Sequence, residues 1–173
     1  AGLGFALAAA GALVLAPERP WLWLVAAVLV QLRLLANLID GMVAVEGGRG
    51  GPLGLLWNEA PDRIEDVAIL AGFGAAAGAY GLGLWAGIAA LACAWTRAFG
   101  ASLGLGQDFR GPMAKPHRMA AVTLGCVLGF GAAVAGSGLG LPALVLWAIL
   151  LGALLTAARR LARIASRLRA GAP

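Results

Sequence analysis

Apolar stretches long enough to cross a bilayer follow one another along almost the whole chain. Of its 173 residues, 61% are hydrophobic and only 12% are charged. A soluble domain is about 45–50% apolar and about 25% charged. The difference is too large for one buried core, and the same composition excludes a disordered chain. The sequence therefore predicts an integral membrane protein with several spans.

Six segments have the character of a membrane-spanning helix, which needs about 20 mostly apolar residues. No segment alternates as the strand of a membrane barrel does. We therefore expect an all-α fold with one transmembrane domain over residues 1–173. Its first span is expected to be truncated, because the chain begins inside an apolar run. The expected spans cover about residues 1–16, 21–45, 58–80, 82–105, 118–135 and 142–164.

The basic residues fall almost entirely on one side of this six-span arrangement, and Arg19 alone lies on the other. Cytoplasmic loops carry the excess of Lys and Arg, so the basic side and the C-terminus are expected in the cytoplasm. The net charge of +5 is then a topology signal and a match to anionic lipid, and nucleic acid is not an expected partner. The tail after residue 159 is either a stop-transfer flank or an amphipathic interfacial helix. The basic side contains Arg49, Arg63, Arg97, Arg110, Lys115, Arg118, Arg159, Arg160, Arg163, Arg167 and Arg169.

Acidic residues gather on the same side of the membrane. Six of the eight acids lie between Asp40 and Asp66. Helical periodicity places four polar residues of the third span on one face and two of the second span on another, and a hairpin of these spans would bring the two sets together. Crowded carboxylates need a cation, and their oxygens suit Mg²⁺, Mn²⁺ or Ca²⁺. Acids near a helix N-terminus also complement its dipole, which accounts for Glu59 but not for Asp40 at a C-terminal end. The residues expected to converge are Asn37, Asp40, Asn58, Asp62, Glu65 and Asp66.

A cationic loop is expected to meet these acids. Residues 107–118 hold Arg110, Lys115, Arg118 and the only histidine of the chain. Lys and Arg are natural partners of phosphate, so the segment is either a phosphate-binding loop or an ordinary positive-inside loop. Arg33 lies inside the second span, where it must face protein or water and pair with an acid or a lipid phosphate.

The segment from Asn37 to Asp62 resembles the signature of the CDP-alcohol phosphotransferase family, which reads D-x2-D-G-x2-A-R-x8-G-x3-D-x3-D. The spacing is kept throughout, and six spans are also the architecture of that family. Asn37 and Asn58 stand where the family has aspartate, and Val45 stands where it has arginine, so the chain is similar to a divergent branch. The positions that match are Asp40, Gly41, Ala44, Gly54 and Asp62.

The resemblance implies a membrane transferase of phospholipid biosynthesis. Such an enzyme moves a phosphatidyl or related phospho-alcohol group from a CDP-linked donor, CDP-diacylglycerol, to an alcohol acceptor and releases CMP. The resemblance also implies a homodimer, two Mg²⁺ or Mn²⁺ ions, and Asp62 as the base that takes the acceptor proton. The implied metal ligands are Asn37, Asp40, Asn58, Asp62 and Asp66, with Glu46, Glu59 and Glu65 as auxiliary acids. The expected substrate-binding residues are Gly41, Ala44, Gly54, Arg110, Lys115 and Arg118.

Two other functions stay open. The loss of two motif aspartates also fits a catalytically altered scaffold of the same fold that binds lipid or nucleotide. A small cation transporter would need acids distributed through the bilayer, whereas these acids gather at one face. Asparagine oxygens can still ligate Mg²⁺, although without the charge of aspartate.

Overall fold

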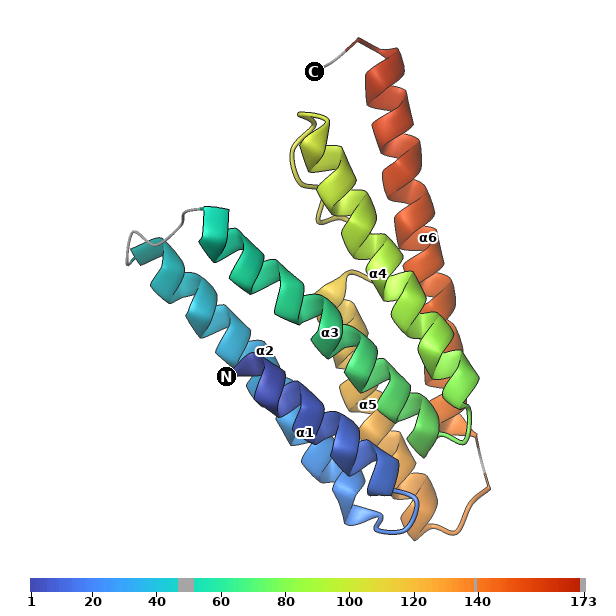
Figure 1. The fold of residues 1–173 in the computed structure, drawn as a ribbon. Coiled ribbons are helices and arrows are strands. Elements are labelled where there is room, and N and C mark those ends of the chain that lie inside the picture. The colour runs from blue at the N-terminus through green and yellow to red at the C-terminus, as the bar shows by residue number, and fades with distance from the viewer. Residues whose placement is uncertain (47–51, 139, 172–173) are drawn as a thin grey trace.

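The computed structural model is a bundle of six helices, shown in Figure 1. The structure describes residues 1–46, 52–138 and 140–171. The all-α prediction is confirmed over these residues. The helices are α1 (Gly2–Leu15), α2 (Trp21–Glu46), α3 (Pro52–Ala76), α4 (Tyr80–Ser102), α5 (Lys115–Val134) and α6 (Leu141–Arg169).

Four helices are long and apolar enough to cross a membrane, namely α2, α4, α5 and α6. Helix α1 is apolar but has only 14 residues. Helix α3 is long enough, but it carries five charged residues between Glu59 and Asp66. Among the described residues, the structure thus supports a membrane protein with four clear spans, and the two remaining helices pack against them.

Helix boundaries differ from the predicted ones most at α3 and α6. Helix α3 begins at Pro52, six residues before the expected start, and a proline is tolerated in the first turn of a helix. It ends where Gly78 adopts a φ of +66° and the Ala79 N–H donates to the Gly74 carbonyl at 2.8 Å, a left-handed cap. Helix α6 continues to Arg169, so the basic tail is the end of that helix.

Small residues let the helices approach one another closely. A Cβ on Gly74 would lie 2.7 Å from the Cα of Gly83, so α3 and α4 cross with their backbones in contact. Gly72 approaches Ala10 of α1 in the same way. In Figure 1, α3 and α4 converge at the turn that joins them and diverge toward their other ends. Those other ends hold the polar residues.

An aromatic pair fixes α2, α3 and α5 at the end of the bundle away from the acids. The rings of Trp23 and Phe73 meet edge to face, with centroids 5.8 Å apart. Gly125 and Gly129 of α5 lie directly against these rings, where any side chain would collide with them. This packing sets the register in which α2, α3 and α5 present their polar residues to one another.

Candidate functional site

A network of buried charges joins α2, α3 and α5. The Arg33 side chain of α2 is fully buried; its Nε donates to Glu65 Oε2 at 2.5 Å and its Nη2 to Asp66 Oδ1 at 2.9 Å. Arg118 of α5 donates to the second oxygen of Asp66, which therefore lies between two guanidinium groups. Charges buried at this depth persist only when they are paired and hydrogen-bonded, as these are.

Asp62 lies at the more open edge of the same network. The Asn37 amide donates to Asp62 Oδ1 at 2.7 Å and to Glu65 Oε2 at 2.9 Å. The Lys115 Nζ is 2.5 Å from Asp62 Oδ2, and 14% of the Asp62 side chain is exposed. The predicted meeting of α2 and α3 at these residues is therefore present, and α5 completes it.

The network is electrically balanced without a metal ion. Three carboxylates, on Asp62, Glu65 and Asp66, face three cations of the chain, listed here as Arg33, Lys115 and Arg118. A divalent ion at these carboxylates would have to displace a cation that already binds them. In the described parts of the chain, no three acid, histidine or cysteine side chains form a group that could hold a metal. The side chains in this arrangement therefore do not fit the pair of metal ions that the motif implies.

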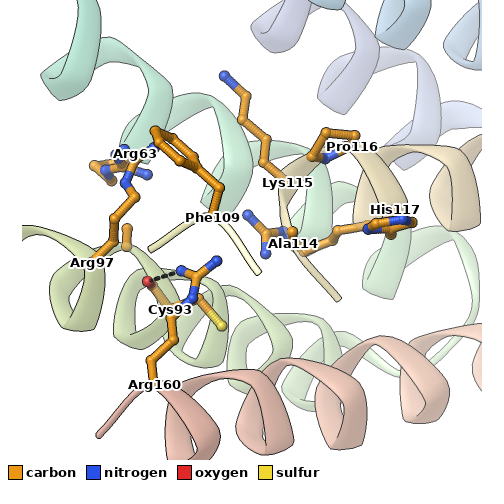
Figure 2. Close-up of a pocket in the computed structure, with 11 residues that line it drawn as sticks. Arg63, Cys93, Arg97, Phe109, Ala114, Lys115, Pro116, His117 and Arg160 are labelled. Carbon is orange, nitrogen blue, oxygen red and sulfur yellow. Dashed lines mark hydrogen bonds between the residues drawn. The ribbon is translucent and has the colours of Figure 1, made fainter. Parts of the chain in front are cut away.

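A cavity of about 200 Å³ adjoins the network and is rimmed by cations. Figure 2 shows Arg63 and Arg97 together beside the Phe109 ring, and Lys115 rises from the start of α5 on the other side of that ring. Arg97 lies over that ring at 5.0 Å from its centroid. The basic side chains lining the cavity are Arg63, Arg97, Lys115, His117, Arg118 and Arg160. Such a rim favours an anionic ligand.

Two buried donors in this region have no partner within the described structure. They are Nη1 of Arg33 and Nε of Arg118. An unsatisfied buried N–H is costly unless water or a ligand accepts from it. Arg118 is also one of the residues that line the cavity.

The loop between α4 and α5 is fastened over the cavity by α6. The Met113 N–H donates to Thr156 Oγ1 at 3.0 Å, and Arg160 Nε donates to the Arg110 carbonyl at 3.1 Å. Arg163 pairs with Asp108 at 2.8 Å. Partial burial opposes ionisation of Asp108, but hydrogen bonds from Arg110 and the charge of Arg163 outweigh it and hold the pKa of that carboxyl below its ordinary value. The basic tail thus contacts the loop.

A groove of about 570 Å³ opens between α3 and α4 next to the cavity. Leu91, Trp95 and Ala98 contribute its apolar wall, while Arg63 and Arg97 belong to both the groove and the cavity. The groove and the cavity therefore adjoin at Arg63 and Arg97, with an apolar surface in the groove and a cationic surface in the cavity. This sequence of surfaces matches a molecule with a lipid tail and a phosphate head.

Several predicted site residues do not join the network. Asp40 is exposed on α2, and Gly41 beside it faces open space. Glu59 binds Arg63 and Arg97 and lines the groove next to the cavity. Arg110 is 69% exposed and pairs with Asp108. The surroundings of Ala44, Glu46, Gly54 and Asn58 lie outside what the structure describes.

Sequence reasoning missed the contributions of Arg63 and Arg160 to the cavity, although it placed both on the basic side of the membrane. The adjacency of Arg63 to Asp62 was the one signal available. The expectation that Arg33 pairs with an acid is confirmed. No protein-family model matches the chain, and no curated protein matches it either. Its function must therefore be argued from the side chains themselves.

Proposed function

We propose that the chain is a membrane transferase that moves a phosphatidyl or related phospho-alcohol group from a CDP-linked donor, such as CDP-diacylglycerol, to a hydroxyl acceptor and releases CMP. One observation carries this proposal: Asp62 and the cations Lys115 and Arg118 meet beside a cavity rimmed with further basic side chains. The signature between Asn37 and Asp62 agrees with it.

In the reaction, the acceptor hydroxyl oxygen attacks the phosphorus of the transferred group. The bond from that phosphorus to the CMP oxygen breaks, CMP leaves with the electron pair, and Asp62 takes the hydroxyl proton. Asp62 suits this role because it is partly exposed, whereas Asp66 is buried between two guanidinium groups. No step is assigned to a metal ion.

The cations of the cavity would hold the donor pyrophosphate. Lys115 is 27% exposed and can exchange Asp62 for a phosphate oxygen, which also frees the carboxylate to act as a base. The free Nε–H of Arg118 supplies a further donor. Fixed positive groups at the leaving phosphate stabilise the charge that develops there. The apolar groove between α3 and α4 would take the acyl chains of a lipid donor.

The proposal places all six helices in a bacterial inner membrane, as a homodimer, with the site on the cytoplasmic side. Two features support α3 as a further span: Glu65 and Asp66 are buried inside the bundle, and Ile64 is 56% exposed on its outer side. A helix that keeps its charges inside and an aliphatic side chain outside can lie in lipid.

The full chain in detergent, supplied with CDP-diacylglycerol and a panel of alcohols, tests the reaction through release of CMP. The unaltered protein should release CMP, and Asp62→Asn should abolish release while donor binding persists. Glu18→Gln, an acid lost from the opposite side of the molecule, serves as the matched control and should remain active. An Asp62→Asn variant that turns over like the unaltered protein would contradict the proposal.

A second candidate is a scaffold that binds the donor without transferring anything. The observation that favours it is the pairing of all three network carboxylates with cations, which leaves no acid free in the described site. In that case the unaltered protein binds CDP-diacylglycerol, and none of the alcohols leads to CMP release.

A further inference from the structure

We propose that cationic side chains of the chain itself take the place of a bound metal ion at this site. Arg33 and Arg118 bind and neutralise the carboxylates of α3, so the site folds without a divalent ion. This inference rests on the proposed function only for the identity of the site. The inference itself concerns how the folded protein is held together, and it is tested without any transfer reaction.

Arg33 lies where the carboxylates of α3 converge. Its nitrogens are 2.5 Å from Glu65, 2.9 Å from Asp66 and 3.6 Å from Asp62. One buried group therefore touches or neighbours three acids, which is the position that a bound cation would take. A guanidinium is a fixed charge with several donors in one plane, and it stays protonated at any pH that the fold survives.

Asn37 fits this arrangement because it is an amide. Its nitrogen donates to Asp62 and to Glu65 at once, at 2.7 and 2.9 Å. An aspartate there has no N–H to donate and would bring a fourth negative charge against two others. An asparagine at position 37, where the motif has aspartate, therefore suits a site whose carboxylates are neutralised by cations of the chain itself.

Helix α1 covers the network where Asn37 and Glu65 meet. A side chain at Gly2 of α1 would collide with the Asn37 and Glu65 side chains, so α1 packs directly over them. Mg²⁺ usually keeps several of its waters in proteins and needs space for them. Adding two positive charges to three acids and three cations would leave an excess charge at the centre of the bundle.

The test is thermal unfolding of the full chain in detergent, measured in EDTA, in Mg²⁺ and in Mn²⁺. The unaltered protein should melt at one temperature in all three solutions, and elemental analysis should find no bound divalent metal. Asn37→Asp should melt lower in EDTA and recover with Mg²⁺ or Mn²⁺ by at least roughly 2–4 °C, a shift well resolved for a chain of this length. Arg33→Gln should respond in the same direction.

Matched controls make the same chemical changes on the surface. Gln107→Glu replaces an exposed amide by a carboxylate, and Arg159→Gln removes an exposed guanidinium; neither should create a response to metal. An unaltered protein that loses stability in EDTA, or an Asn37→Asp protein that folds and ignores both metals, would overturn the inference. Should Arg33→Gln fail to fold, these two results still decide. Absence of CMP release bears on the proposed function alone.

Discussion

Asp62 and Asp66 lie one helical turn apart on α3 and meet different surroundings. Asp66 is 2% exposed and binds Arg33 and Arg118, so both of its oxygens are occupied by guanidinium groups. Asp62 is 14% exposed and binds Lys115, whose side chain is 27% exposed. The environment therefore assigns a structural role to one carboxylate and leaves the other accessible to a substrate.

This contrast predicts opposite effects of one substitution at the two positions. Asp66→Asn leaves the buried Arg118 without its anion, takes one of its carboxylate partners from Arg33, and should cost about 3–5 kcal/mol of unfolding free energy. Asp62→Asn should cost much less, since its partner Lys115 reaches solvent. Unfolding of both variants in detergent measures the difference, with the exposed Asp40→Asn as control. Equal losses at positions 62 and 66 would show that the burial of Asp66 has no energetic consequence.

The charge of Lys115 is expected to strengthen binding of the CDP-linked donor. Lys115→Ala removes one charge-assisted contact to phosphate and should weaken CDP-diacylglycerol binding about tenfold to a hundredfold, which corresponds to about 1.5–3 kcal/mol. A binding titration on the folded protein measures this effect. Arg169→Ala removes an exposed cation at the end of α6 and should leave the affinity as it was. Unchanged affinity in the lysine variant would make residues 107–118 an ordinary positive-inside loop.

At the scale of elements, the end of α6 organises the loop that covers the cavity. Thr156, Arg160 and Arg163 each bind a different part of that loop, and Arg167 donates to the Leu105 carbonyl at 3.1 Å. Hydropathy indicates where an apolar span ends, but it does not indicate which segment the basic turns beyond it will contact. For that reason the sequence left the tail open between two interpretations, and neither included the loop.

Asp108 makes the attachment of this loop dependent on pH. Its pKa is lowered in the folded protein, so its contribution to stability is present above its ordinary value of 3.8 and is lost as the pH falls through the lower folded value. Backbone hydrogen exchange of the loop, corrected for intrinsic rates, should therefore accelerate below about pH 4. Asp108→Asn should already exchange fast at pH 6 and show no further step. A step of equal size in both proteins would place the titrating group elsewhere.

Contacts between neighbouring helices of the site could be predicted from the sequence, and contacts between distant segments could not. Periodicity identified the polar faces of α2 and α3, so the contact of Asn37 with Asp62 was foreseeable from two neighbouring helices. The bond of Arg118 to Asp66 joins residues 52 positions apart and depends on which helix packs behind α3. The donor role of Asn37 was hidden for another reason: its motif position indicates a metal ligand, while its actual partners are acids.

At the scale of the whole molecule, the two sides of the bundle differ in charge and in accessible loops. The site and the end of α6 lie on one side, and the turn with Arg19 lies on the other. With the site in the cytoplasm, single cysteines at Gln107 and Ala170 should be labelled only by a reagent that crosses the inner membrane, and one at Arg19 by an impermeant reagent outside. The natural cysteines, Cys93 and Cys126, are buried and serve as the unlabelled background. Labelling of position 107 from outside would invert the topology.

The close contact between Gly74 of α3 and Gly83 of α4 lies near the turn that joins the two helices, far from Asp62. Gly74 is twelve positions from Asp62, so this contact lies roughly 18 Å along the helix from the carboxylate proposed as the base. A methyl group on Gly83 would press on the α3 backbone at Leu70 and tilt the two helices apart. The spacing of spin labels at Ala60 and Ala98, which line the groove, should then increase, and longer acyl chains should be accepted. An unchanged spacing would mean that the bundle absorbs the strain locally. With an increased spacing, residues that no acyl chain touches would set the chain length that the groove accepts.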